Sequence, residues 1–220
     1  MAESTAEKLD AFVMVGLPER DGARLYNSLL TASPPRAGGC VTSVYRKHFL
    51  YDTDKTWATP GDGFMIQELA LRRASGGGGD KTVVRVCPAI CMDLNPRDFV
   101  APFDAYELAT FAKDNEAHVV LCSMAWLRAA EDDGEDAEKD DERGSALRTM
   151  SYWVARCAPL LSQTSRTHLV ACNRVDTERG TTFAGTSCIV DLGTEDEARP
   201  SVLTYAKSKG QALIVADIDM

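Results

Sequence analysis

The sequence from Val83 to Pro96 reads Val-Val-Arg-Val-Cys-Pro-Ala-Ile-Cys-Met-Asp-Leu-Asn-Pro. It begins as an apolar, β-branched run, which is typical of a buried strand. It turns polar after Cys91, where Asp93, Asn95 and Pro96 indicate a turn and a helix start. A thiol at the end of a buried strand is held rigidly and can face a cleft, as a nucleophile requires. Most free cysteines are buried small hydrophobes, so the stretch alone fits a core residue equally well.

Length and composition predict one globular domain spanning residues 1–220. The chain is long enough to bury a sizeable core, and 45% hydrophobic with 26% charged residues is ordinary for soluble proteins. No apolar run is long enough to cross a membrane, and the polar first ten residues do not match a signal peptide. Seven scattered cysteines without a CxxC pair argue against disulfides or a zinc ribbon. We therefore expect a reduced, cytoplasmic setting.

The net charge of −9 is concentrated in one segment. Residues 131–143 hold nine acidic residues against Lys139 and Arg143, which leaves about −2 for the rest of the chain. The segment predicts a disordered acidic insertion. Nucleic-acid binding would require a basic face, which the composition does not indicate. The glycines at 76–79 lack the pattern of a phosphate-binding loop.

Apolar runs alternate with amphipathic segments along the chain, which predicts an α/β fold. Strands are expected at 11–15, 25–30, 41–44, 83–90, 119–122, 168–173, 183–192, 201–206 and 212–218, and helices at 105–115 and 146–161. A strand, a helix and a second buried strand in that order indicate a βαβ crossover with parallel pairing.

Chemically capable residues follow several of these runs. Tyr45-Arg46-Lys47, Cys91, Ser123 to Trp126 and Asn173 all come where an apolar run ends. In open α/β sheets, sites lie beyond the carboxyl ends of strands. A lysine between aromatics fits an exposed strand end, but it also fits a cation held in a cleft that stabilises an oxyanion.

The same residues resemble the nitrilase (carbon–nitrogen hydrolase) superfamily. Residues 45–50, Tyr-Arg-Lys-His-Phe-Leu, resemble its lysine motif, and residues 90–94, Ile-Cys-Met-Asp-Leu, resemble its cysteine motif. Residues 172–175, Cys-Asn-Arg-Val, resemble its later strand. Residues 91–96, 99–103 and 123–127 are similar to the eukaryotic protein N-terminal amidases, which deamidate N-terminal Asn and Gln and feed an N-degron pathway. The resemblance covers nearly the whole chain from Ala11 onward.

This resemblance implies amide hydrolysis through a cysteine thioester, without a metal or other cofactor. Cys91 is the implied nucleophile, and Lys47 with the backbone N–H of Met92 is the implied oxyanion site. Trp126 and Met124 are expected to form a wall for the first residue of the substrate.

Asn173 is expected among the substrate-binding residues, and peptide or protein N-termini are the expected substrates. The resemblance implies that the protein is a homodimer. It also implies a location in the cytoplasm and in the nucleus. No membrane or nucleic-acid partner is expected.

One part of the family pattern has no clear counterpart in the sequence. The family's general-base glutamate lies on a strand–helix unit well before the lysine, so the expected fold is an α-β-β-α sandwich incomplete at the N-terminus. Glu19 imitates the glutamate motif but lies too near Lys47, and Glu107 is the other acid considered. A supporting acid is not obvious between Thr56 and Asp62. The chain therefore fits the C-terminal part of an active hydrolase, or a binding protein that has lost catalysis. A small-amide amidase or nitrilase of the same superfamily is the other alternative.

Overall fold

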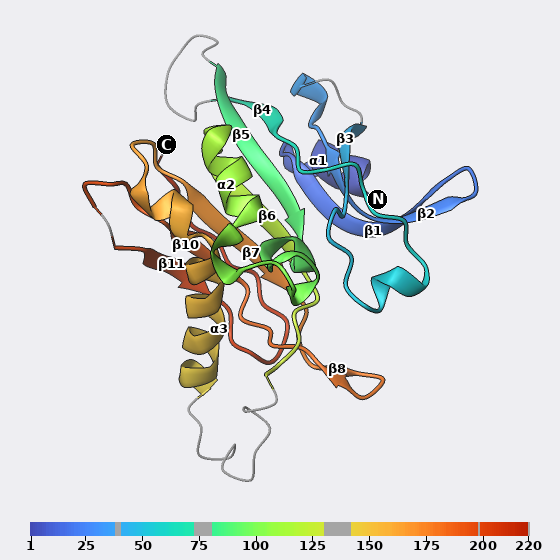
Figure 1. Cartoon of the computed structure of the whole chain (residues 1–220). Coiled ribbons are helices and arrows are strands. Elements are labelled where there is room, and N and C mark those ends of the chain that lie inside the picture. Colours follow the sequence, from blue (N-terminus) through green and yellow to red (C-terminus); the bar gives the residue numbers. More distant parts are fainter. Residues whose placement is uncertain (38–40, 73–80, 130–141, 198, 220) are drawn as a thin grey trace.

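A six-stranded mixed sheet forms the larger part of the structure, a computed structural model that describes residues 1–37, 41–72, 81–129, 142–197 and 199–219 (Figure 1). Its strand order is β11-β10-β7-β6-β5-β4. The strands are β4 (Gln67–Arg72), β5 (Lys81–Ile90), β6 (Val119–Met124), β7 (His168–Asn173), β10 (Cys188–Asp191) and β11 (Ser201–Tyr205). Strands β5, β6 and β7 are parallel, as the predicted crossover requires, and the other pairs are antiparallel.

A second sheet of three antiparallel strands comes from the first part of the chain. It is formed by β1 (Val13–Asp21), β2 (Arg24–Ala32) and β3 (Val41–Arg46), and α1 (Ala2–Leu9) packs against β1 and β2. A short hairpin is formed by β8 (Thr177–Glu178) and β9 (Thr181–Thr182). The other α-helices described are α2 (Glu107–Asp114) and α3 (Glu142–Arg156).

The core lies on both faces of the six-stranded sheet. One face packs against α2 and α3 through a cluster that includes Cys87, Ala89, Leu108, Ala109, Ala112, Val120, Cys122, Met150, Trp153, Leu169 and Val190. Two smaller clusters fill the space toward the three-stranded sheet, one with Val84, Val86 and Val119 against Phe12 and Met14, the other with Leu29, Tyr45 and Ile90. Figure 1 shows α2 and α3 on one side of the six-stranded sheet, and the three-stranded sheet with α1 on the other. The layering is that of a nitrilase-like α/β sandwich, as predicted.

The structure corrects several predicted elements. The first strand does not end at Gly16-Leu17-Pro18 but continues to Asp21. It is an edge strand, and a proline is tolerated there because one side of the strand needs no hydrogen bonds. Strand β4 was not expected from the sequence, the run at 183–192 forms a strand only over Cys188–Asp191, and 212–218 forms none.

Pro88 lies within the central strand β5, where a proline is unusual. Strand β4 pairs with β5 only as far as Val86, so Pro88 lies beyond the end of that ladder and pairs with Leu121 of β6 alone. The missing N–H therefore costs no hydrogen bond to β4. Of the predicted acidic insertion, only the last two residues are described, and α3 begins with them.

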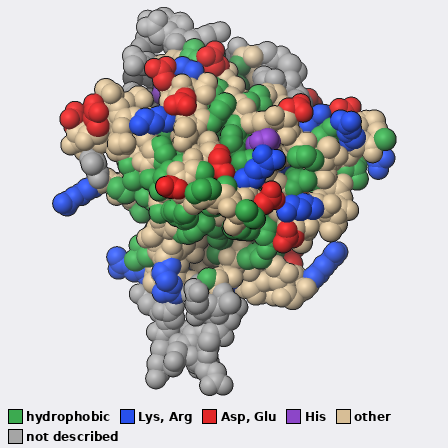
Figure 2. Space-filling model, viewed as in Figure 1, with side chains coloured by type: hydrophobic (Ala, Val, Ile, Leu, Met, Phe, Trp, Pro, Cys, Tyr) green, Lys and Arg blue, Asp and Glu red, His purple; other side chains and the backbone are tan. Residues whose placement is uncertain are grey.

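The surface carries charges of both signs. Figure 2 shows basic and acidic side chains spread around a central area of hydrophobic side chains on the viewed face. In the described part of the chain, no helix combines the length and apolar character needed to cross a bilayer.

His168, the first residue of β7, predicts a pH dependence of stability. It is 1% exposed, its Nε2 lies 3.9 Å from Asp191 Oδ1, and burial lowers its pKa below the usual value. The unfolded chain therefore binds this proton more readily, so the contribution of His168 to stability is present above about pH 6.5 and is lost as the pH falls. The unfolding free energies measured with urea at about pH 7.5 and at about pH 5 should differ less for His168→Gln than for the unchanged protein.

A core variant without a titrating group separates this effect from general destabilisation. Val190→Ala removes buried methyl groups from β10, so it should lower the unfolding free energy by the same amount at both pH values. An unchanged pH dependence in His168→Gln would contradict the assignment.

Candidate active site

Cys91 lies at the carboxyl end of β5, where the chain turns into a 3-10 helix over Cys91–Leu94. Its backbone has φ 45°, in the left-handed region that non-glycine residues rarely adopt. Strained backbone of this kind recurs at functional sites, where the surrounding structure enforces it. The next N–H, that of Met92, belongs to the first turn of the helix, where N–H groups have no partner within the helix.

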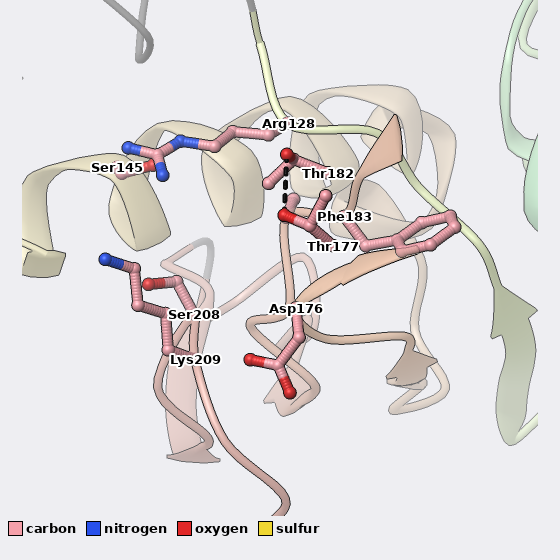
Figure 3. A pocket seen from close by; sticks show the side chains of 9 residues that line it. Arg128, Ser145, Asp176, Thr177, Thr182, Phe183, Ser208 and Lys209 are labelled. Carbon is pink, nitrogen blue, oxygen red and sulfur yellow. Dashed lines mark hydrogen bonds between the residues drawn. The ribbon is translucent and has the colours of Figure 1, made fainter. Parts of the chain in front are cut away.

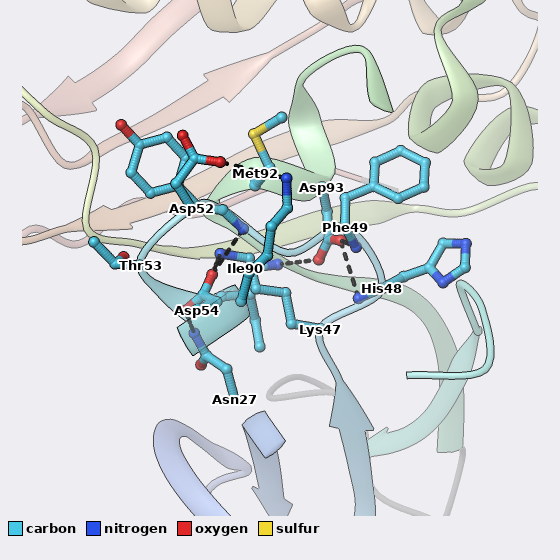
Figure 4. A network of polar contacts seen from close by, with 12 residues as sticks. Asn27, Lys47, His48, Phe49, Asp52, Thr53, Asp54, Ile90, Met92 and Asp93 are labelled. Carbon is cyan, nitrogen blue, oxygen red and sulfur yellow. Dashed lines mark hydrogen bonds and ion pairs between the residues drawn. The ribbon is translucent and has the colours of Figure 1, made fainter. Parts of the chain in front are cut away.

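Lys47 follows directly after β3 and is buried, with a 3% exposed side chain. Its Nζ lies 2.5 Å from Asp54 Oδ2, which also accepts the Tyr51 N–H at 3.0 Å. Asn27 Nδ2 donates to the other oxygen, Asp54 Oδ1, at 3.0 Å. Figure 4 shows Asn27, Lys47 and Asp54 converging from different parts of the chain. A buried ammonium requires such a partner, so the pair fixes the position of Lys47.

The turn after Lys47 is held by a glycine. The Gly61 N–H donates to the Lys47 carbonyl at 2.8 Å. A Cβ at residue 61 would lie 2.1 Å from the Arg46 carbonyl oxygen, so only glycine allows this close approach.

The electrostatic surroundings of the Cys91 thiol combine opposing effects. Burial raises its pKa, while the Lys47 ammonium and the backbone N–H of Ala125 lower it. The charges of Asp54 and Asp93 act in the direction of burial. The Asp93 carboxylate accepts the N–H of Ile90, the residue before Cys91, and the N–H of His48, the residue after Lys47, so the structure brings together the two segments that the sequence predicted at separate strand ends.

Trp126 and Asn173 form one side of the site region. Asn173 Oδ1 accepts the Trp126 N–H at 2.8 Å, and its Nδ2 donates to the Gly185 carbonyl at 2.7 Å. The Trp126 ring centroid lies 5.6 Å from that of Tyr152. Met124 is 4% exposed and belongs to the core cluster. The Asn173 amide therefore holds the Trp126 segment in place through backbone contacts.

The two glutamates considered as the general base are held elsewhere. Glu19 forms an ion pair with Arg46 at 2.5 Å and accepts the Ser28 hydroxyl at 2.6 Å. Glu107 lies 3.6 Å from the buried Arg156 guanidinium and accepts the Arg97 N–H. Each of these carboxylates is therefore engaged by an arginine side chain.

A separate hollow of about 420 Å³ lies beside the chain that follows Trp126. It is lined by Arg128, Ser145, Asp176, Thr177, Thr182, Phe183, Ala184, Ser208 and Lys209. Figure 3 shows the Arg128 and Lys209 side chains toward the same side of it, with the Thr177 and Thr182 hydroxyls hydrogen-bonded at 2.9 Å. It contains neither Cys91 nor Lys47 and is therefore distinct from the Cys91–Lys47 centre.

Asp54 is a site residue that the sequence pattern did not predict. The expected window for a supporting acid, 56–62, begins two residues too late. The available signal was an acid seven positions after the lysine, within the turn-forming stretch Asp52-Thr53-Asp54.

Comparison with known proteins identifies similar sequences. No protein-family model matches the chain. It is 30% identical to the protein N-terminal amidase of Schizosaccharomyces pombe, over 99% of this chain and 74% of that protein. It is 34% identical to the protein N-terminal amidase of Saccharomyces cerevisiae, over 59% of this chain and 29% of that protein.

The fold is also found among solved structures. A crystal structure of N-terminal amidase with an Asn-Glu-Ala peptide superimposes with a TM-score of 0.76 at 20% identity. The match covers 94% of this chain and 78% of that one. At this identity the structural likeness establishes the fold, and the sequence relatives establish the family.

Proposed function

Because the chain belongs to the protein N-terminal amidase family of the nitrilase superfamily, we propose that it is an amidohydrolase that deamidates N-terminal Asn and Gln of proteins. The observation that supports this most directly is the buried Lys47–Asp54 ion pair acting on a cysteine at the end of β5. A nucleophile and a fixed cation beside it are what acyl transfer from an amide requires.

The proposed reaction has two stages. A general base, which in this family is a glutamate, takes the proton of the Cys91 thiol, and the resulting thiolate attacks the side-chain amide carbon. The carbon–nitrogen bond then breaks, and the nitrogen leaves as ammonia after taking up that proton. Water hydrolyses the remaining thioester, which releases Asp or Glu at the N-terminus and restores the thiol.

Lys47 and the backbone N–H of Met92 are the proposed oxyanion site. The ammonium is held by Asp54 at 2.5 Å and needs no rearrangement as negative charge develops on the amide oxygen. The same cation favours the thiolate form of Cys91.

Trp126, Met124 and Asn173 are the proposed substrate-binding residues. The partly exposed Trp126 ring is the surface on which the first residue of the substrate would rest, with Met124 in the core beside it. Asn173 fixes this segment through its amide. An aromatic ring offers a large apolar contact surface with a defined geometry.

The cellular setting of the proposed activity follows from its product. An N-terminal Asn converted to Asp is a changed degradation signal, so we place the protein in an N-degron pathway, in the cytoplasm and also in the nucleus. We further propose a homodimer, and neither a membrane nor a nucleic acid as partner.

Substrate discrimination tests this proposal. A protein that carries this chain together with the family's general-base glutamate should release ammonia from a peptide that begins with Asn or Gln, and not from the same peptide with an acetylated N-terminus or an internal Asn. Mass spectrometry would follow the accompanying gain of about 1 Da. Release of ammonia from small free amides but not from Asn-initiated peptides would instead favour a small-amide amidase.

A further inference from the structure

Asp93 has an unusual environment for a carboxylate. It is fully buried, at 0% exposure, and four hydrogen-bond donors surround it. Its Oδ2 accepts the Tyr45 hydroxyl and the Ile90 N–H, both at 2.8 Å. Its Oδ1 accepts the Phe49 N–H at 2.8 Å and the His48 N–H at 3.2 Å. An ionised carboxylate has about four acceptor positions, so the donors match its capacity.

These donors belong to the two segments that carry the proposed reaction. The three N–H groups are those of the residue before Cys91 and of the two residues after Lys47. Figure 4 shows Asp93 between the Lys47–Phe49 segment and Ile90. The Asp93 side chain therefore holds the backbone directly before Cys91 and directly after Lys47.

Among the strands that the structure describes, no pairing provides this connection. Cys91 follows β5 of the six-stranded sheet, whereas Lys47 follows β3 of the three-stranded sheet, and the two strands belong to different sheets. At this point the sheets meet through the apolar cluster of Leu29, Tyr45 and Ile90. Apolar contact is non-directional, while hydrogen bonds depend on distance and angle.

We propose that Asp93 is a positioning residue that fixes the Lys47 ammonium relative to the Cys91 sulfur by tying the ends of β3 and β5 together. The proposal rests on the proposed function only in taking Cys91 and Lys47 as the reacting pair. A site of this kind needs its groups held to about half an ångström, which four hydrogen bonds to one buried group supply.

The charge of Asp93 and its positioning role predict opposite results. The negative charge raises the pKa of the Cys91 thiol. If charge alone mattered, neutralising Asp93 would favour the thiolate and speed its reactions. If Asp93 holds Lys47 in place, neutralising Asp93 lets the Lys47 ammonium move away from Cys91 and slows the reactions of the thiolate.

The variant Asp93→Asn separates the two. Its amide keeps the size but turns an NH₂ group toward two N–H or O–H donors, which breaks about half of the contacts. Alkylation of Cys91 by iodoacetamide, followed across pH by peptide mass spectrometry, should slow by about tenfold or more near neutral pH. In the amidase assay kcat should fall with KM little changed.

Two further variants keep the test decisive. Tyr45→Phe removes one of the four donors and leaves the charge of Asp93, so it should also slow alkylation of Cys91, but by less than Asp93→Asn. This variant still tests the proposal if Asp93→Asn does not fold. Val190→Ala lowers stability at a distance in β10 and should leave the Cys91 alkylation rate unchanged.

The proposal is overturned if folded Asp93→Asn alkylates as fast as the unchanged protein or faster. It is also overturned if Tyr45→Phe alkylates at the unchanged rate, or if Val190→Ala slows alkylation equally. A failure of the proposed function would look different: the unchanged protein would not release ammonia from Asn-initiated peptides, whereas the alkylation rates would still test Asp93.

Discussion

Cys91→Ala is expected to abolish ammonia release from Asn-initiated peptides. The thiol is the nucleophile in the proposed reaction, and a methyl group cannot form the thioester. The change removes one sulfur from a partly exposed position at the end of β5, so the fold should tolerate it. Ammonia release and the thermal unfolding midpoint, measured on the same preparation, would separate lost chemistry from lost structure.

Cys87→Ala is the matched control, since Cys87 lies four residues earlier in the same strand. It is fully buried, and burial raises the pKa of its thiol to about 12, so it is not ionised near neutral pH. This variant should keep its activity while losing some stability. Deamidation by Cys91→Ala, or its loss in a stable Cys87→Ala protein, would reject the assignment of the nucleophile.

The parts of the fold that the sequence predicted are those set by local patterns. The apolar runs before Cys91 and Asn173 predicted strands β5 and β7, because burial on both faces demands a continuous apolar run. The continuation of β1 through Pro18 could not be predicted in the same way. Its cause is the place of β1 at the edge of its sheet, which depends on which strands pair.

The site shows the same division. Cys91 and Lys47 were candidates because each follows an apolar run, and the resemblance to the nitrilase superfamily implied their roles. Asp93 read as a turn residue, although its side chain binds the Tyr45 hydroxyl, 48 positions away in the sequence. Asp54 lies among polar residues that resemble a solvated turn, and only the folded chain buries it beside Lys47. Partners that meet across two sheets leave no periodic signal in the sequence.

Lys47→Arg is the second change expected to have a large effect, a loss of about 100- to 1000-fold in kcat. The lysine side chain is 3% exposed and its ammonium lies 2.5 Å from Asp54, so the site has little room for a broader, planar guanidinium. An arginine would pair with the Asp54 carboxylate through two N–H groups, which directs its charge away from the position of the oxyanion. Because arginine keeps the positive charge, any loss in kcat is due to the changed position of that charge.

Lys55→Arg gives the comparison on the surface. Lys55 pairs with Asp98 at 2.9 Å and its side chain is 47% exposed, so an arginine should fit there and leave kcat unchanged. Steady-state ammonia release by the two variants, with the Cys91 alkylation rate as a second measure, distinguishes a specific role of Lys47 from a general intolerance of arginine. A group that stabilises a transition state must lie within hydrogen-bond distance of the charge that develops there, and the arginine would hold its charge away from that position. Near-normal turnover by Lys47→Arg would therefore reject Lys47 as the oxyanion cation.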